Sequence, residues 1–334
     1  MKYRRLGSSN LLVSELCLGT MMFGDQTDAR EAAEIVSAAR DQGVNFVDTA
    51  DVYSAGASER LLAPLLAADR DRWVLATKVG NKMSDRPNES RYSRKWIVQA
   101  AEASLKRLGT DYVDIYYLHR DFEDENLDEP LRAMDDLIRA GKIRYFGLSN
   151  YRGWRIAEVA RLCDAIGMPR PVVCQPYYNL LNRVPEVEIL PACANYGLGV
   201  TPYSPIARGV LTGKYLPEQA PPDGTRAARG DKRILETEWR AESLSIAQEL
   251  KEHAQERGIA LTQFAVAWVL ANRLVSSVIA GPRTLAQWRD YFGAIDVQLT
   301  DDDEALVNAL VAPGHPSTPG YSDPSYPFFG RRVC

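Results

Sequence analysis

Three apolar stretches of this 334-residue chain lead directly into ionisable residues. Residues 44–47 precede Asp48, residues 73–77 precede Lys78 and residues 113–118 precede His119, while Tyr53 follows Asp48 after a short polar run. If the acid, the amine, the imidazole and the phenol faced one cavity, they could polarise and protonate a carbonyl oxygen without a metal ion or a covalent nucleophile.

Each of these four side chains has a distinct chemical use. A tyrosine has an ordinary pKa of about 10, and a nearby Lys78 ammonium is expected to lower the pKa of Tyr53 and make its phenol a better acid. Asp48 would keep Lys78 cationic and oriented. His119 would donate a second hydrogen bond to the same oxygen, an arrangement that suits hydride delivery to the carbonyl carbon.

Plainer interpretations exist for each residue taken alone. Asp48 could cap a turn, Tyr53 could be a loop aromatic, Lys78 a surface residue and His119 a hydrogen-bonded core histidine. A different chemistry is also open, since Lys78 in an apolar pocket could form a Schiff base in a lyase.

The elements that must position these groups form a repeated pattern of strand followed by helix. This pattern predicts an α/β fold, a single (β/α)8 TIM barrel over residues 1–334, with a doubly wound sheet as the alternative. In such barrels active groups project from the carboxyl ends of the strands, where Asp48, Lys78 and His119 would lie. The predicted strands are 16–20, 45–49, 73–78, 113–118, 143–148, 172–175, 198–203 and 276–280.

Three further segments are added to the barrel pattern. Residues 2–14 predict an N-terminal β-hairpin cap turning at residues 7–10, and residues 301–310 predict an extra C-terminal helix. The connection 205–237 is long and rich in Gly, Pro and basic residues, so it is either a lid over an anionic ligand or a solvated insertion. The tail 313–334 either folds over the barrel mouth or is disordered.

Composition excludes several classes of protein. A net charge of −4 gives no general attraction for nucleic acid or an anionic membrane, and the N-terminus lacks the apolar core of a signal peptide. We therefore expect a soluble cytoplasmic protein that acts on a small molecule. Five scattered cysteines and three histidines predict neither a disulfide framework nor a metal site.

A nucleotide phosphate would have to be bound without the usual loops, because the chain has no GxGxxG motif. Barrels commonly hold phosphates near the loops after strands 7 and 8, which here contain Lys214 and residues 281–284. Arg283 could grip a phosphate with its forked guanidinium, and Thr284 begins a helix whose N-terminus favours an anion.

Taken together, the motifs resemble those of the aldo-keto reductase family over roughly residues 3–311. The resemblance implies a (β/α)8 barrel that binds NADPH/NADP+, with Tyr53 as proton donor and Asp48, Lys78 and His119 as its partners. The matching stretches are 18–21 (LGTM), 48–53 (DTADVY), 76–78 (ATK), 117–119 (YLH), 147–150 (GLSN), 175–179 (QPYYN), 203–205 (YSP) and 213–215 (GKY).

The same resemblance assigns the cofactor site. Ser149, Asn150 and Gln175 would hold the carboxamide of a nicotinamide ring stacked on Tyr203. Ser204, Ile206 and Lys214 would follow the pyrophosphate, with Arg283, Thr284 and Gln287 around the 2′-phosphate, and the remaining contacts would come from Gly19, Thr20, Met21, Asp48, Pro205, Gly209, Gly281 and Tyr291.

The last of these motifs departs from the family pattern. Pro282, Asp290 and Tyr291 stand where the family often has Ala, Glu and Asn. Arg283 nevertheless favours NADPH over NADH, because a 2′-phosphate needs a cationic partner.

The resemblance and the residues lead to one expected function and one rival. The expected function is NADPH-dependent reduction of an aldehyde or ketone, reversible as alcohol oxidation. Phe23, Phe122, Tyr177 and residues 321–329 suggest an apolar mouth that admits a bulky or ring-shaped carbonyl. The rival is a nucleotide-binding regulatory subunit that senses redox state, a role also found in the family.

Overall fold

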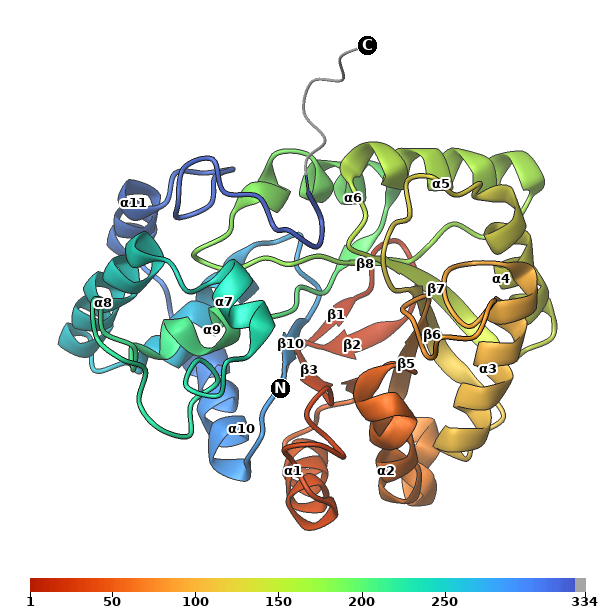
Figure 1. The fold of residues 1–334 in the computed structure, drawn as a ribbon, viewed down its shortest axis with the longest axis horizontal. Coiled ribbons are helices and arrows are strands. Elements are labelled where there is room, and N and C mark those ends of the chain that lie inside the picture. The colour runs from red at the N-terminus through yellow and green to blue at the C-terminus, as the bar shows by residue number, and fades with distance from the viewer. Residues whose placement is uncertain (328–334) are drawn as a thin grey trace.

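The core of the protein is a sheet of eight parallel strands (Figure 1). The computed structural model describes residues 1–327. In chain order the strands are β3 (Leu16–Gly19), β4 (Phe46–Asp48), β5 (Val74–Val79), β6 (Val113–Leu118), β7 (Ile143–Ser149), β8 (Val173–Gln175), β9 (Gly199–Val200) and β10 (Val278–Ala280).

The sheet closes on itself, which makes the fold the expected (β/α)8 barrel. Strands β3 to β9 pair in chain order and β10 pairs with β3, so β9 and β10 are the two ends of the sheet. These ends meet through a parallel bridge between Val200 and Val275. The Ser276 and Ile279 amides also donate to the carbonyls of Val200 and Pro202 at 2.8 and 3.0 Å. The doubly wound sheet is therefore excluded.

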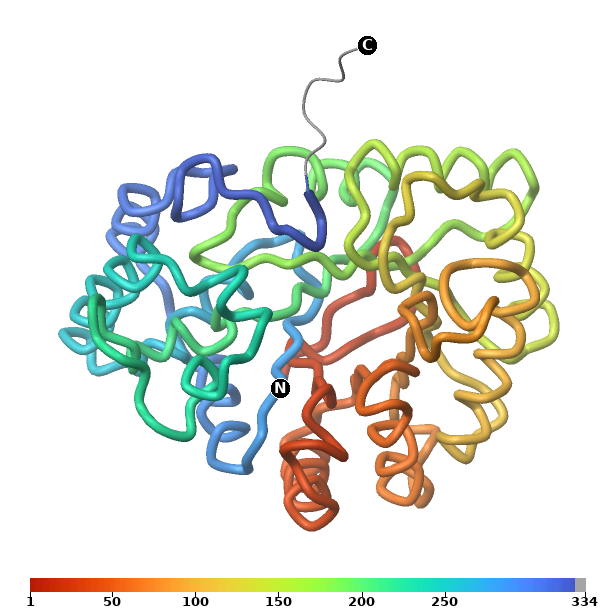
Figure 2. Tube along the Cα trace, viewed as in Figure 1, coloured from red at the N-terminus to blue at the C-terminus, as the bar shows by residue number. Residues whose placement is uncertain are grey.

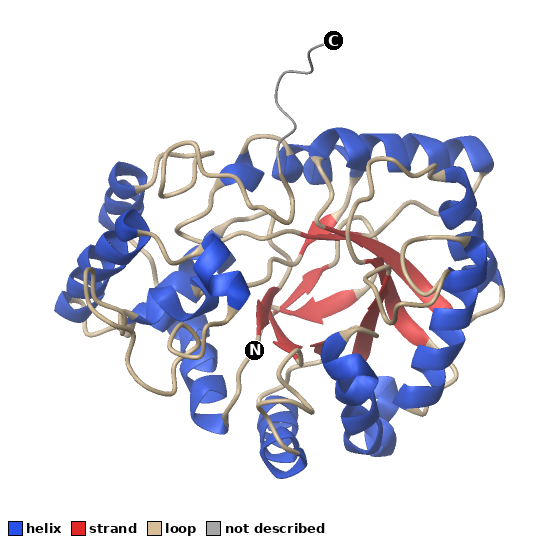
Figure 3. Cartoon of the chain, viewed as in Figure 1, coloured by secondary structure: helices blue, strands red, loops and turns tan. Residues whose placement is uncertain are grey.

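Helices surround the strands (Figure 3) because their apolar stripes face the sheet. In α1, for example, Asp28 caps the N-terminus, and Ala32, Ile35, Val36 and Ala39 recur at helical spacing and are buried. The outer helices are α1 (Ala29–Asp41), α2 (Ala57–Leu66), α3 (Arg94–Leu108), α4 (Asp128–Arg139), α5 (Gly153–Ile166), α6 (Ile189–Tyr196), α8 (Ala241–Glu256), α9 (Leu261–Ala271), α10 (Leu285–Phe292) and α11 (Asp301–Leu310).

The predicted N-terminal hairpin is present and is formed by β1 (Tyr3–Arg5) and β2 (Leu12–Ser14). Figure 1 shows it at the centre of the ring of helices. Its Leu6 and Val13 are fully buried and belong to the apolar cluster that fills the barrel interior, together with Phe46 and Ile115. The hairpin thus plugs the amino-terminal end of the barrel and leaves the carboxyl ends of the strands open for a site.

Two connections contain more structure than the sequence pattern indicated. Residues 205–237 include the short helices η4 (Ala207–Thr212) and α7 (Lys232–Thr237). The connection between β8 and β9 contains the short helix η3 (Val184–Glu186) in addition to α6. After α11 the chain, dark blue in Figure 2, runs back over the barrel toward the centre of the ring of helices.

Among the helices of residues 1–327, none has the length and the apolar composition that a membrane-spanning helix needs.

Candidate active site

The three ionisable strand-end residues converge as the barrel geometry requires. Asp48 is the last residue of β4, Lys78 lies near the end of β5, and His119 follows β6 directly. The phenol of Tyr53 reaches them from η1 (Tyr53–Gly56), and its hydroxyl oxygen lies 3.2 Å from Lys78 Nζ. Asp48, Tyr53 and His119 line one cavity of about 350 Å³ at this end of the barrel.

A tight turn with unusual backbone angles brings Tyr53 back over the strands. Ser54 and Ala55, directly after Tyr53, have positive φ angles of 48° and 51°, and Gly56 follows at 82°. The positive φ of Gly56 favours glycine, and a Cβ there would also lie 2.7 Å from Arg107 Cδ. Left-handed non-glycine residues cost free energy, and they concentrate at sites where the chain must be held in one arrangement.

Lys78 uses all three of its ammonium donors within the protein. The ammonium donates to Asp48 Oδ1 at 2.5 Å, to the Thr49 carbonyl oxygen at 2.7 Å and to the Tyr53 hydroxyl at 3.2 Å. Burial by itself would lower the pKa of Lys78, but the interactions with Asp48 and Tyr53 outweigh it and raise the pKa above its ordinary value. Lys78 therefore stays charged, which does not suit the free amine that a Schiff-base lyase requires.

The pKa of the Tyr53 phenol is shifted in the opposite direction to the one that the sequence argument predicts. Burial raises the pKa of Tyr53, and this outweighs the nearby Lys78 ammonium, which lowers it, so the pKa lies above 10. The sequence argument considered the ammonium and omitted the desolvation of the phenolate. The phenol is consequently protonated throughout the neutral range and has a proton to donate.

His119 is held as a neutral imidazole. Burial, followed by the charges of Lys78 and Arg120, lowers its pKa well below the ordinary value. Its ring meets the Tyr53 ring edge-on, with centroids 6.0 Å apart. A neutral imidazole still carries one N–H, so it can donate a hydrogen bond to an oxygen beside the phenol.

Polar residues at the next strand ends form a connected hydrogen-bond network. Gln175 Nε2 donates to Asp48 Oδ2 at 2.9 Å, and the Ser149 hydroxyl donates to the Gln175 carbonyl oxygen at 3.0 Å. Asn150 Nδ2 donates to Ser149 Oγ, while the Tyr203 hydroxyl donates to Asn150 Oδ1 at 2.8 Å. The network fixes the orientation of the two amides beside the catalytic candidates.

The expected cofactor residues line the same cavity, with one exception. Thr284 does not line it, because its hydroxyl caps α10 by accepting from the Gln287 amide. Lys78 lies fully buried beneath the cavity. The sequence-predicted residues that line the cavity are Gly19, Thr20, Met21, Asp48, Tyr53, His119, Ser149, Asn150, Gln175, Tyr203, Ser204, Pro205, Ile206, Gly209, Lys214, Gly281, Arg283, Gln287 and Tyr291.

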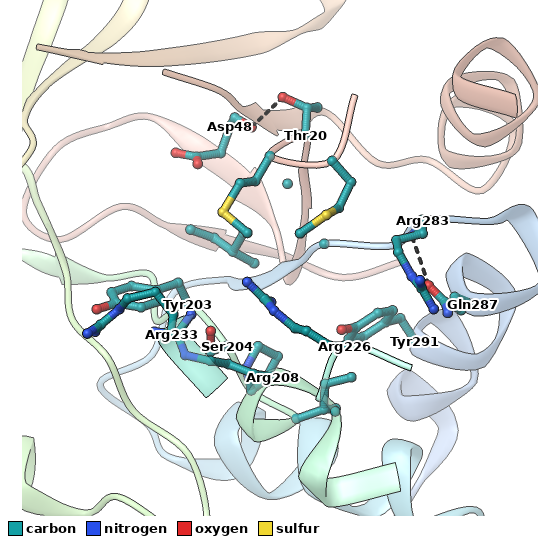
Figure 4. Close-up of a pocket in the computed structure, with 18 of the residues that line it drawn as sticks. Thr20, Asp48, Tyr203, Ser204, Arg208, Arg226, Arg233, Arg283, Gln287 and Tyr291 are labelled. Atoms are coloured by element: carbon teal, nitrogen blue, oxygen red, sulfur yellow. Dashed lines mark hydrogen bonds between the residues drawn. The ribbon is translucent and has the colours of Figure 1, made fainter. Parts of the chain in front are cut away.

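Basic side chains line much of the cavity, and Figure 4 shows four of them: Arg208, Arg226, Arg233 and Arg283. Within residues 1–327, four of the basic lining side chains have no carboxylate at ion-pair distance, namely Arg208, Lys214, Arg229 and Arg283. Burial, with the nearby charges of Arg283 and Arg229, lowers the pKa of Lys214. Arg208, Lys214 and Arg283 are partly buried, whereas Arg229 is exposed. A group of cations without carboxylate partners among the described residues is stabilised by an anion of several charges.

The structure adds residues that the sequence did not single out. Gln26 Oε1 accepts from Arg229 Nη2 at 2.8 Å and from Arg283 Nη1 at 3.4 Å, so two arginines from distant segments meet at one amide. The Leu285 amide, at the start of α10, is bonded to Glu31, so this helix N-terminus already has protein partners. Other lining residues outside the predicted set are Met22, Arg208, Thr212, Arg226, Arg233, Thr262, Ile279 and Asp290.

Signals for some of these residues were present in the sequence. Arg208, Arg226, Arg229 and Arg233 belong to the basic connection 205–237, and they line the cavity as a lid would require, whereas the Lys232 side chain is 83% exposed and pairs with Glu236. No local pattern pointed to Gln26, because its approach to the arginines depends on the path of the chain in three dimensions.

The expected apolar mouth is only partly present. Phe23 is fully buried, so its assignment to the mouth was wrong: its apolar ring belongs to the hydrophobic core cluster. Tyr177 packs against Tyr203 with ring centroids 5.6 Å apart and does not line the main cavity. Tyr326 does line it, whereas residues 328 and 329 lie outside the described part of the chain.

A second acid close to the site has an unusual environment. Asp51 is 1% exposed and both of its carboxylate oxygens lack hydrogen-bond partners within residues 1–327. Burial, reinforced by the charge of Glu59, raises the pKa of Asp51 to about 8. The native state therefore holds this proton over a range of pH in which the unfolded chain, with an Asp pKa of about 3.9, has lost it.

Asp51→Asn is expected to stabilise the protein increasingly as pH rises from 5 to 8. Because the native state binds more protons than the unfolded state in this window, wild-type stability falls with rising pH, and the amide removes this loss. The free energy of unfolding should rise by a few kcal/mol, with roughly 6 kcal/mol as the upper limit set by the pKa difference. Urea unfolding at both pH values measures it, with the exposed Asp85→Asn as control. A gain that does not change with pH would contradict the argument.

The barrel and the site together define a class of protein, and sequence comparison gives the same class. The model of the Aldo/keto reductase family matches residues 15–312, and the chain belongs to this family. Membership implies an oxidoreductase that uses a nicotinamide cofactor and acts on small carbonyl compounds.

Individual relatives carry different names. The chain is 39% identical to a probable voltage-gated potassium channel subunit beta of Arabidopsis thaliana, over 89% of this chain and 92% of the relative. It is 37% identical to the uncharacterized oxidoreductase YrpG of Bacillus subtilis, over 96% of this chain and 100% of the relative. It is 35% identical to the L-glyceraldehyde 3-phosphate reductase of Escherichia coli K12, over 94% of this chain and 93% of the relative.

Proposed function

We propose that this protein is an NADPH-dependent reductase of aldehydes or ketones in which Tyr53 is the general acid. One observation carries the proposal: the Tyr53 phenol, 3.2 Å from the Lys78 ammonium, lines the same cavity as four cations that have no acidic partner in the described part of the chain. The first group can protonate a carbonyl oxygen, and the second can hold a phosphate-rich cofactor.

The residues of the cavity fit the proposed cofactor. Arg208 and Lys214 would meet the pyrophosphate, while Arg283 and Arg229, which converge on Gln26, would meet the 2′-phosphate. Tyr203 offers an aromatic face at the nicotinamide end, close to Ser149, Asn150 and Gln175. When bound, NADPH supplies the hydride that adds to the carbonyl carbon.

The chain's own groups would act on the carbonyl oxygen. Tyr53 donates its proton to that oxygen as negative charge develops on it, and the neutral His119 ring donates a second hydrogen bond. Lys78, held charged by Asp48, stabilises the phenolate that remains. The reverse transfer, alcohol oxidation, uses the same groups with Tyr53 as base.

The relatives named as potassium channel subunits favour a second candidate, a nucleotide-binding regulatory protein. The two functions differ in turnover, since a regulatory protein would bind NADPH without consuming it continuously with small aldehydes.

An NADPH-consumption screen beside NADH tests the proposal. The substrates should include short aldehydes, ring ketones and, in view of the glyceraldehyde phosphate reductase relative, a phosphorylated aldehyde. We expect sustained turnover with NADPH and a higher kcat/KM for ring ketones than for short aldehydes, because aromatic Tyr326 borders the cavity. Binding of NADPH without turnover over the whole set would favour the regulatory candidate.

A further inference from the structure

The segment that follows α11 contributes a residue to the cavity that holds the candidate catalytic groups. Its residue Tyr326 lines the cavity that contains Tyr53 and His119. In Figures 1 and 2 this segment, dark blue, leaves α11 and runs toward the centre of the ring of helices, where it ends near β8. We call residues 313–327, the described part of the predicted tail 313–334, the tail. The tail therefore forms a wall on the side where a carbonyl substrate would approach the phenol.

The tail is held to the barrel by two arginines next to predicted site residues. Arg120, directly after His119, donates from Nη2 to the Ser325 carbonyl oxygen at 3.0 Å, and its guanidinium lies 5.1 Å from the centroid of the Tyr326 ring. Arg152, in the loop after β7, donates to the Tyr326 carbonyl oxygen at 2.7 Å. Both hydrogen bonds are accepted by backbone carbonyls of the tail, so the two arginines fix the position of the tail backbone.

On its other side the tail is bonded to the basic connection 205–237. Arg233, in α7, makes a two-pronged ion pair with Asp323, with Nη2–Oδ2 at 2.6 Å and Nη1–Oδ1 at 3.1 Å. Arg233 Nη1 also donates to Ser325 Oγ at 2.8 Å, and the Tyr321 hydroxyl donates to the Glu236 carbonyl oxygen. The Asp323 side chain is only 11% exposed, so this bidentate pair is shielded from solvent and strong for its type.

Arg233 thus joins the segment that would cover the cofactor to the segment that borders the substrate. Phosphates bound by Arg208, Lys214 and Arg229 would order the connection 205–237, and an ordered α7 presents Arg233 in one position. Through its ion pair with Arg233, Asp323 then fixes the tail relative to α7, and the fixed tail places Tyr326. Since coupling between two ligands is reciprocal, a substrate that packs on Tyr326 would in turn favour the ordered cofactor segment.

We infer that Asp323 is a positioning residue through which cofactor binding places the Tyr326 wall of the substrate site. The inference rests on the proposed function, because it requires NADPH to bind along the connection 205–237. Asp323 itself does not line the main cavity. It is therefore expected to act through Arg233 and Tyr326, not by contact with substrate or cofactor.

Asp323→Asn tests the inference by hydrogen exchange of the full-length protein with and without NADP+. In the wild type, NADP+ is expected to slow exchange of amides both in 205–237 and in 321–326. In the variant, slowing should persist in 205–237 and be lost in 321–326. Equal slowing of the tail in both proteins would overturn the inference.

Kinetics with 4-nitrobenzaldehyde and NADPH give an independent measure. The variant is expected to raise KM for the aldehyde by about 10-fold, while kcat and the Kd for NADPH change less than about twofold. Asp164→Asn is the matched control, because it breaks a bidentate pair with Arg170 on the exposed surface far from the cavity. A change in kcat or in the Kd for NADPH that matches the change in KM would contradict a positioning role.

These measurements separate the inference from the function on which it rests. If NADP+ slows exchange in neither segment of the wild type, the cofactor assignment and the coupling are both wrong. If it slows 205–237 but not 321–326, the cofactor assignment stands and the coupling is wrong.

Discussion

Tyr53→Phe is expected to reduce kcat for carbonyl reduction by about 10²–10⁴-fold, because it removes the only proton donor whose hydroxyl touches Lys78 in the described cavity. The ring is retained, so the edge-on contact with His119 should survive. The Kd for NADPH should change little, since no phosphate-binding group is altered. Stopped-flow or steady-state NADPH consumption measures the first quantity, and fluorescence titration measures the second.

The surroundings of Tyr53 add a pH dependence to this prediction. Because burial keeps the pKa of Tyr53 above 10, the phenol is protonated from pH 6 to 9, and deprotonation of Tyr53 should not reduce kcat for reduction in that range. A loss of activity centred near neutral pH would have to arise from another group.

The control is a tyrosine of similar chemistry on the surface. Tyr112 donates its hydroxyl to Asp71 and lies outside the cavity, so Tyr112→Phe should leave both kcat and the Kd for NADPH unchanged. Turnover by Tyr53→Phe at the wild-type rate would remove Tyr53 from the role of general acid and leave the cofactor assignment intact.

Arg283→Ala is expected to weaken NADPH binding by about 10- to 100-fold, the equivalent of losing a charge-assisted hydrogen bond of roughly 1.5–3 kcal/mol. Arg283 has no acidic partner within residues 1–327, and its side chain meets Arg229 at Gln26 on the cavity wall. The Kd for NADH should change by less than about threefold, because NADH lacks the 2′-phosphate that the guanidinium would grip.

Arg289→Ala serves as the matched control for this variant. Arg289 is exposed, lies on the same helix α10 and does not line the cavity, so it tests whether a change of net charge alone weakens binding. Equal losses of NADPH and NADH affinity in Arg283→Ala would refute recognition of the 2′-phosphate.

The arrangement of the catalytic candidates was largely predictable from sequence. Asp48, Lys78 and His119 follow apolar stretches that become β4, β5 and β6, and parallel strands in a closed barrel end at the same face. The spacing of these residues therefore predicts their convergence once the strands are identified. Tyr53 joins them because the turn after β4 is short.

The energetics of the same residues needed the three-dimensional surroundings. The sequence indicated that Lys78 would lower the pKa of Tyr53. The degree of burial decides the sign of the shift, and burial raises the pKa. Phe23 was placed at the mouth for its aromatic character, yet it is fully buried. Desolvation depends on every neighbouring atom, and no local pattern reports it.

By itself, the sequence determined the repeated strand and helix pattern, the ionisable groups at strand ends and the basic character of residues 205–237, since these follow from local periodicity and composition. Tertiary structure alone decided that Gln26 joins Arg229 to Arg283, that Glu31 bonds the start of α10, and that Asp323 ties the tail to Arg233. The physical reason is that irregular segments have no repeat to fix their path. Their contacts depend on where the barrel places partners that are distant in the chain.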